Sequence, residues 1–465
     1  MTSDSADLKF GHSAFQGRFG IARADITPPV GVYSRCWGAA AHDTADSIHR
    51  PLQLTVLVLS SHDDDELILI DADLGWWKTP GVYQKFAARL LEAVQVPTDW
   101  LIFALTHTHA GPPLMDPDED LPGSDLLGPW MEQLLQTAID SIQLARQEQF
   151  AGVLEWASGH CGLAAVRDLP DPNGDRFLCG FEPAEPADET LILGRITDDS
   201  GKIRATLSNY ACHPTTLAWE NTSISPDYIG SMRETIETQT AAPALFLLGM
   251  CGELAPRHQY SGDPSVADQH GRVLGFASLS TLENMNPAGQ VLAWEGSMES
   301  GAPLAVWRHS ASNPSQLLKA YTLSVPIPLK DWPSADALEA ERRECKDRAM
   351  EERLRRKRDI RRGIGDGDTW ELTIWIWQLG DALLVGTCCE PYSVLQQAVR
   401  RAFPDRSVVC MNLINGSIGY LPPADLYDHD VYPVWQTPFD RGSLEIVMEA
   451  MISGIRGVLE GTGSE

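Results

Sequence analysis

The chain has 465 residues, of which 43% are hydrophobic and 22% charged, values typical of a globular protein with a sizeable core. Its 36 basic and 64 acidic residues give a net charge of −28, which argues against general nucleic-acid binding and docking on an anionic membrane. Nine cysteines without a C-x-x-C pair indicate free thiols in a reducing compartment. Because no secretion signal or long apolar run is present, we expect a cytoplasmic protein without stable membrane insertion.

Short apolar runs rich in Val, Ile and Leu predict buried strands along the whole chain. They lie at residues 54–59, 67–70, 100–105, 191–196, 205–210, 244–248, 372–379, 383–385 and 408–413. Apolar residues at helical spacing predict helices at residues 82–96, 130–146, 228–238, 392–403 and 444–459. This interleaving excludes all-α and all-β folds and predicts a layered α/β fold. Within the 372–379 run, Trp375 and Trp377 would lie on one face of a half-buried strand.

Two segments stand out by their charge. Residues 341–362 contain 11 Lys or Arg and 6 Asp or Glu, and a glycine-rich stretch follows them at 363–367. They predict a long exposed helix with a glycine cap, within a solvated helical excursion at about residues 335–367. The alternative is a basic contact for a partner or an acidic ligand. The acidic segment 116–120 is either a solvated loop or a negative rim that selects a polar or cationic substrate.

Two histidine segments follow predicted strands, which is where α/β folds hold functional side chains. The first, THTHAGPP at residues 106–113, would project His107 and His109 together, because residues i and i+2 of a strand share a face. Two imidazoles aimed at one spot are half of a zinc site or a satisfied structural pair. The second, NYACHPTT at residues 209–216, brings His213 to a strand end, as a ligand or as a structural histidine.

Two later segments bring an oxygen-bearing side chain to the end of a strand. Glu390, in CCEP at residues 388–391, can reach into a cleft or stabilise the dipole of the helix that follows. Tyr420, in NGSIGYLPP at residues 415–423, lies between a glycine and a Pro-Pro turn, and a simple turn aromatic is the alternative. The sequence contains neither a G-x-S-x-G elbow nor an H-E-x-x-H zinc motif.

Taken in order, these segments resemble the neutral/alkaline (non-lysosomal) ceramidase family, from Gly20 to about Asp440. GIARADITPPVG at residues 20–31 resembles its amino-terminal signature, and THTHAGPP resembles its T-H-T-H-S-G-P motif. The second histidine block is matched by residues 209–216 followed by SPDYIG at 225–230. The family's tyrosine run, with further tyrosines at +7 and +12, is matched by Tyr420, Tyr427 and Tyr432.

The resemblance implies an α/β fold in which helices flank a central β-sandwich of mixed sheets, with a single zinc site at strand ends. It also implies one catalytic domain over residues 1–465. The family's larger members carry a C-terminal immunoglobulin-like domain, which we expect this chain to lack because it stops about 25 residues after Asp440. The implied metal ligands are His107, His213, Glu390 and Tyr420. Bound Zn²⁺ would lower the pKa of its water towards ~7 and polarise the scissile carbonyl.

Three further positions match residues around the family's metal. His109 is implied as a proton shuttle, Arg167 as a contact for a substrate oxygen and Tyr432 as a donor to the developing oxyanion. For Arg167 a surface ion pair with Asp168 is the alternative. Ala255 stands where ceramide-cleaving members have a serine, which excludes a serine nucleophile there and favours metal-activated water.

We therefore expect a zinc-dependent hydrolase that cleaves the C–N bond of a small, soluble, linear N-acyl compound rather than membrane ceramide. An ester or lactone hydrolase and an amide- or lactam-forming enzyme on the same site are alternatives. A non-catalytic binding protein on this scaffold is a third. The sequence leaves homo-oligomerisation open.

Overall fold

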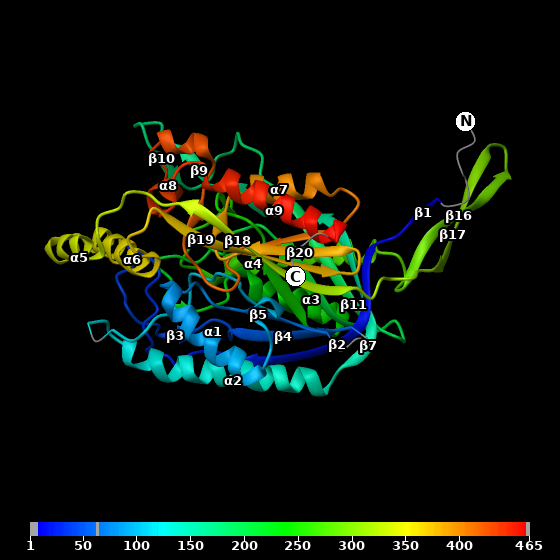
Figure 1. Cartoon of the computed structure of the whole chain (residues 1–465), viewed down its shortest axis with the longest axis horizontal. Coiled ribbons are helices and arrows are strands. Elements are labelled where there is room, and N and C mark those ends of the chain that lie inside the picture. The colour runs from blue at the N-terminus through cyan, green and yellow to red at the C-terminus, as the bar shows by residue number, and fades with distance from the viewer. Residues whose placement is uncertain (1–7, 62–64, 119, 462–465) are drawn as a thin grey trace.

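Two face-to-face β-sheets form the centre of the molecule (Figure 1). The computed structural model describes residues 8–461 apart from 62–64 and 119. The larger sheet contains, in spatial order, β14 (Ala244–Leu248), β12 (Ile203–Tyr210), β11 (Thr190–Asp198), β7 (Phe150–His160), β2 (Ser13–Asp25), β4 (Gln53–Ser60), β5 (Glu66–Ala72) and β6 (Leu101–Leu105). The smaller sheet contains β18 (Leu318–Pro328), β19 (Thr369–Leu379), β20 (Ala382–Thr387) and β22 (Val408–Met411). Both sheets combine antiparallel with parallel pairs, the latter being β12–β14, β5–β6 and β20–β22.

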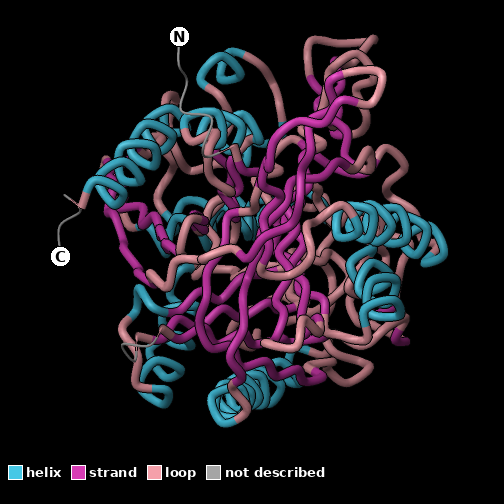
Figure 2. Tube along the Cα trace, turned by 90° about the vertical axis from the view of Figure 1, so that its right-hand side faces the viewer, coloured by secondary structure: helices cyan, strands magenta, loops and turns pink. Residues whose placement is uncertain are grey.

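Helices cover the outer face of each sheet, and Figure 2 shows the strands enclosed by them. The larger sheet packs against α1 (Pro80–Val94), α2 (Leu127–Gln147), α3 (Tyr228–Thr240) and α4 (Pro264–Glu283). The smaller sheet packs against α7 (Ser393–Ala402) and α9 (Ser443–Glu460). The predicted α/β fold, with helices flanking a central sandwich of mixed sheets, is confirmed.

The apolar core follows the period-2 alternation of the strands. Trp375 and Trp377 of β19 pack between the two sheets, as their spacing predicts. Ile374 and Ile376 point to the opposite face, where α7 and α9 cover them. The strand is therefore buried on both faces, and the expectation of a half-buried strand is wrong because helices occupy the face that was assigned to solvent.

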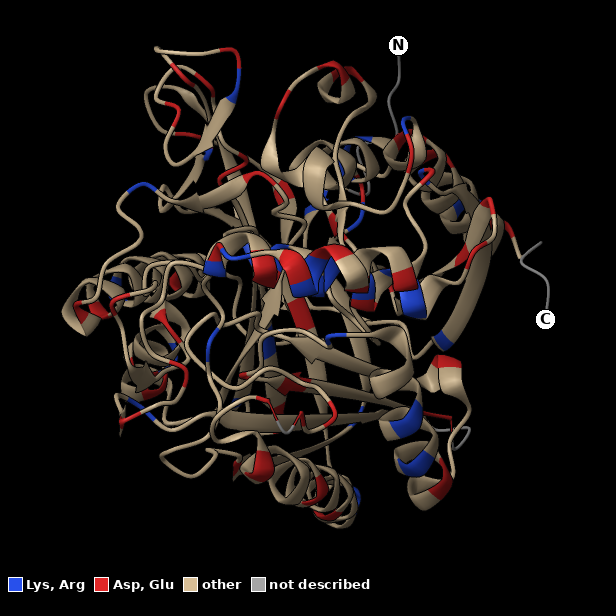
Figure 3. Ribbon diagram, turned by 90° about the vertical axis from the view of Figure 1, so that its left-hand side faces the viewer, with Lys and Arg blue, Asp and Glu red and all other residues tan. Residues whose placement is uncertain are grey.

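The charged segment forms two helices, α5 (Ala335–Glu344) and α6 (Arg348–Ile364), instead of the one helix expected. The side chain of Asp347 accepts a hydrogen bond from the Met350 N–H and so begins the second helix. In Figure 3, which views the end of the molecule where these helices lie, basic and acidic residues alternate along them. Glu352 and Leu354 of α6 are buried, so the prediction of an exposed helix is wrong for one side of α6.

The remaining elements are short or peripheral. A hairpin of β16 (Gln290–Glu299) and β17 (Pro303–Ala311), extended by β1 (Lys9–Phe10), projects from the body (Figure 1). Short pairs join β3 (Ser47–Ile48) to β13 (Ser223–Ile224), β8 (Ala164–Val166) to β15 (Leu254–Pro256), β9 (Asp168–Pro170) to β10 (Phe177–Cys179), and β21 (Glu390–Pro391) to β23 (Tyr420–Leu421). The short helix α8 spans Tyr432–Gln436. None of the helices in the described part of the chain has the length and apolarity needed to cross a bilayer.

Candidate metal centre

The two histidines of the THTHAGPP segment lie in a loop beyond the end of β6. His107 has a φ of 71°, a left-handed conformation uncommon for a residue with a side chain. Its N–H donates to the carbonyl oxygen of Leu74 over 2.8 Å, which fixes this turn. His107 and His109 therefore do not converge because they share one face of a strand, and that part of the prediction is wrong. Their side chains nevertheless meet, with the two Nε2 atoms 3.4 Å apart.

Backbone carbonyls orient the imidazoles of His107 and His213. The Nδ1 atom of His107 lies 3.1 Å from the oxygen of Gly75, and Nδ1 of His213 lies 2.7 Å from that of Cys251. A carbonyl oxygen can only accept, so each Nδ1 carries the proton and each Nε2 presents a lone pair. This arrangement is typical of metal-binding histidines, whose second nitrogen is held by a backbone or carboxylate acceptor.

Strand pairing brings the two oxygen-bearing residues together. β21 and β23 pair in parallel with Glu390 directly opposite Tyr420. Oε2 of Glu390 lies 2.9 Å from Nε2 of His213 and 3.2 Å from Nε2 of His107. The Tyr420 ring stacks on that of His213 with centroids 6.1 Å apart. Both residues are buried, so the structure brings all four predicted ligands to one place.

The donor set fits a metal ion. One ligand atom each from His107, His213 and Glu390 lies within 4.8 Å of the others. Two imidazole lone pairs and a carboxylate oxygen are all acceptors, and acceptors at this spacing repel one another unless a cation lies among them. Two nitrogen ligands with carboxylate and phenolic oxygens match the donor types that zinc accepts.

The protonation states agree with such a site. Burial lowers the pKa of His213 to about 4, so the imidazole is neutral near pH 7. Burial alone would raise the pKa of Glu390, but His107 and His213 lower it well below its usual value. A neutral His213 facing an ionised carboxylate is in the form that binds a metal.

His109 and Tyr432 lie beside this cluster. The ring of His109 packs against Trp76 and Trp37, with centroids 4.9 and 5.2 Å away. Its Nδ1 atom is buried and has no hydrogen-bond partner. The Tyr432 ring lies 5.7 Å from that of Tyr420. Both side chains therefore border the space next to the candidate ligands.

Arg167 is 3% exposed and lies behind Tyr420, with its Cζ atom 5.5 Å from the centroid of that ring. It donates to the backbone oxygen of Gly252 over 2.7 Å. Asp168 accepts instead from the hydroxyl of Tyr392. The alternative of a surface ion pair between Arg167 and Asp168 is therefore wrong. Tyr427, by contrast, donates to the oxygen of Phe439 outside the cluster.

A cavity of about 540 Å³ opens beside the cluster and contacts His109, Arg167, Tyr420 and Tyr432. This volume suits a small organic ligand.

The cavity is also lined by residues that no motif predicted, among them Trp37, Tyr260, Glu352, Arg353 and Arg356. Trp219 also lines it. Trp76 and Trp77 line an adjoining hollow, and Trp77 packs against core aromatic rings as well. The unusual charge of residues 341–362 was the one signal that could have pointed to α6.

Comparison with solved structures identifies this architecture. The crystal structure of neutral ceramidase from Pseudomonas aeruginosa superimposes with a TM-score of 0.68 at 17% sequence identity, covering 97% of this chain and 76% of the other. The chain has the neutral ceramidase fold. A structure of a ceramidase complexed with C2 gives a TM-score of 0.69 with the same identity and coverage. No protein-family model and no curated protein matches the sequence. The resemblance to neutral ceramidases is thus confirmed at the level of the fold.

Proposed function

We propose that the protein is a zinc-dependent hydrolase that cleaves the C–N bond of a small, soluble, linear N-acyl compound. The observation that carries this proposal is the convergence of His107, His213 and Glu390, with both histidines oriented by backbone carbonyls. The neutral ceramidase fold supports the choice of an amide bond. Tyr420 completes the proposed ligand set from the strand that pairs with Glu390.

A zinc ion bound to these residues would supply Lewis acidity, which polarises a carbonyl group and makes a nearby water more acidic. Side chains of the protein transfer the proton, stabilise the developing negative charge and position the substrate. His109 takes up at Nε2 the proton that the attacking water gives up and delivers it to the departing amine nitrogen. Tyr432 donates its hydroxyl proton in a hydrogen bond to the carbonyl oxygen as negative charge develops there. Arg167 positions Tyr420 and contacts a substrate oxygen.

The cavity supports a compact substrate. Its volume of about 540 Å³ accommodates a small organic molecule, and α6 lies along one side of it.

All nine cysteines fall within the described residues and are unpaired, which supports the proposed cytoplasmic location. The shared core between the two sheets supports one catalytic domain in the chain.

The proposal is tested by turnover of linear N-acyl amines and matched esters with the purified protein, a chelator-treated sample, and that sample with zinc restored. We expect amide hydrolysis that is lost on chelation and recovered at about one zinc ion per chain. Faster turnover of every ester than of its matched amide would favour an esterase. No turnover of either class would contradict a hydrolase.

A further inference from the structure

The cavity beside the candidate metal centre carries an excess of positive charge. Arg167, Arg353 and Arg356 line it, whereas its carboxylates in the described part of the chain are Asp347 and Glu352. Asp347 is engaged at the start of α6, where it accepts from the Met350 N–H. Glu352 is already shared, at 3.2 Å from Arg356 and 3.7 Å from Lys78. Such an excess is unexpected in a chain with a net charge of −28.

Two of the cavity arginines have no acidic partner among the described residues. Arg353 forms no ion pair, and its Cζ atom lies over the ring of Trp435 at 4.0 Å. Arg167 contacts a backbone oxygen, and its buried Nε atom has no acceptor. Arg167 is buried, and a guanidinium group removed from water without a counter-charge is costly, whereas Arg353 is only partly buried. These two side chains are therefore suited to receive an anionic group from a ligand.

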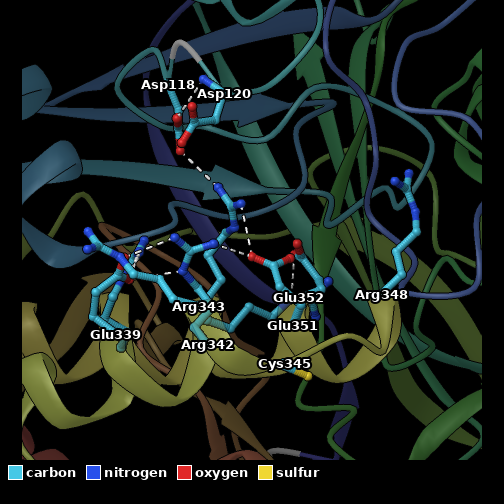
Figure 4. Close-up of polar contacts among 12 residues, drawn as sticks. Asp118, Asp120, Glu339, Arg342, Arg343, Cys345, Arg348, Glu351 and Glu352 are labelled. Carbon is cyan, nitrogen blue, oxygen red and sulfur yellow. Dashed lines mark hydrogen bonds and ion pairs between the residues drawn. The ribbon is translucent and has the colours of Figure 1, made fainter.

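Among the described residues, the arginines of α5 and α6 that do not line the cavity form ion pairs, apart from the exposed Arg362. Figure 4 shows Arg342 and Arg343 joined to Glu339. Arg355 bridges Glu351 and Asp118, the latter over 2.8 Å. The acidic segment 116–120 is thus partly neutralised by α6 instead of forming a free negative rim; its Glu119 lies outside the described residues.

Aromatic rings form the apolar part of the same cavity. Trp37, Trp219 and Tyr260 pack against one another with ring centroids 5.6 to 6.1 Å apart. Such a wall buries apolar carbon atoms. The cavity therefore combines an apolar surface, unpaired guanidinium groups and the candidate metal ligands.

Building on the proposed hydrolase function, we infer that the substrate is an N-acyl amino acid whose carboxylate is held by Arg353 and Arg167. The acyl chain lies on the aromatic wall, and the planar guanidinium groups match the carboxylate geometry. Hydrolysis breaks the amide C–N bond. The hydroxyl of water goes to the acyl carbon and its proton to the nitrogen, which yields a carboxylic acid and a free amino acid.

The kinetic test compares N-octanoylglycine with N-isobutyloctanamide, which has a similar shape but no charge. We expect the wild type to prefer the acid at least ~10-fold in kcat/KM, and Arg353→Gln to lower that preference about 10-fold, because a charge-assisted hydrogen bond is lost. The matched control is Arg362→Gln, on the same helix but exposed and outside this cavity. It should leave the preference unchanged.

A binding measurement separates this inference from the proposed activity. Calorimetry with the unreactive N-(octylsulfonyl)glycine should give tighter binding than its neutral isobutyl counterpart, and Arg353→Gln should remove the difference. Arg353-dependent binding without turnover of any amide would sustain the carboxylate pocket and overturn the hydrolase. Equal turnover and binding of charged and neutral ligands, unchanged by Arg353→Gln, would overturn the pocket and leave the hydrolase standing.

Discussion

Backbone carbonyl groups from other parts of the chain orient two of the candidate metal ligands, His107 and His213. The carbonyl oxygens of Gly75 and Cys251 fix the tautomers of His107 and His213, and each comes from a loop distant in sequence from its histidine. His107 also adopts a left-handed φ of 71°. Strain at such a residue persists only where the surroundings hold it, and it is common at functional sites. The site is therefore built into the fold before any metal binds.

Tyr432 and Tyr427 form a matched pair of tyrosines for testing the proposed oxyanion donor. Tyr432→Phe should lower kcat for amide hydrolysis about 100-fold, because it removes a donor to the developing charge. Zinc content should be unchanged. Tyr427→Phe removes a hydroxyl that donates to Phe439 outside the cluster, so it should lower unfolding free energy by about 1 kcal/mol and leave kcat unchanged. Equal kcat values for the two variants would contradict the role of Tyr432.

At the scale of elements, α7 begins on a carboxylate from another segment. Tyr392, its N-cap residue, makes no side-chain capping bond. Glu253 accepts instead from the N–H of Ser393, with oxygen distances of 2.8 and 2.9 Å, and from the Ser393 hydroxyl. This carboxylate lies two residues before Ala255, in the stretch that resembles the serine motif of ceramide-cleaving enzymes. The stretch therefore anchors a helix in this chain.

Glu253 should make stability depend on pH, because burial raises its pKa to about 7 despite the bonds from Ser393. The unfolded chain releases this proton near pH 4.5 and the folded chain near 7, so stability falls as pH rises between them. Glu253→Gln cannot ionise, so its unfolding free energy relative to wild type should increase by on the order of 2 kcal/mol from pH 5 to pH 8. Urea unfolding at both pH values measures this.

The control for that experiment is Glu283→Gln, which changes an exposed carboxylate at the end of α4. Its difference from wild type should be alike at pH 5 and pH 8. A Glu253→Gln difference that is also the same at both values would show that Glu253 ionises equally in the folded and unfolded chains.

At the scale of the whole molecule, the layered fold could be predicted wherever apolar residues run without interruption. Such runs predict β4, β5 and β6, whereas apolar residues at helical spacing predict α1 and α2. β2 was missed because glycines interrupt it: a Cβ atom at Gly20 would lie 1.8 Å from the oxygen of Ala145 in α2. The glycines of α4 serve the same close packing, since a Cβ at Gly271 would lie 2.3 Å from the oxygen of Tyr228. At these positions the close packing requires glycine, and glycine interrupts the apolar pattern from which a strand or helix is predicted.

Part of the candidate site could likewise be predicted from the sequence and part could not. His107, His213, Glu390 and Tyr420 follow strands in short local segments, so their motifs could be read from the sequence. The contribution of α6 could not, because Arg356 meets the site only through tertiary packing, about 250 residues after His107 in the chain. Composition marked the helix as unusual but did not determine which of its sides would be buried.

The measurement that tests the central claim most directly is elemental analysis of the protein purified without chelators, with His213→Ala and His160→Ala alongside. His160 is 72% exposed and pairs with Glu189 away from the cluster, so its variant controls for loss of a surface imidazole. We predict about one zinc ion per chain in the wild type and in His160→Ala, and none in His213→Ala. A wild type without stoichiometric metal, or a His213→Ala variant that retains it, would contradict the proposed metal centre.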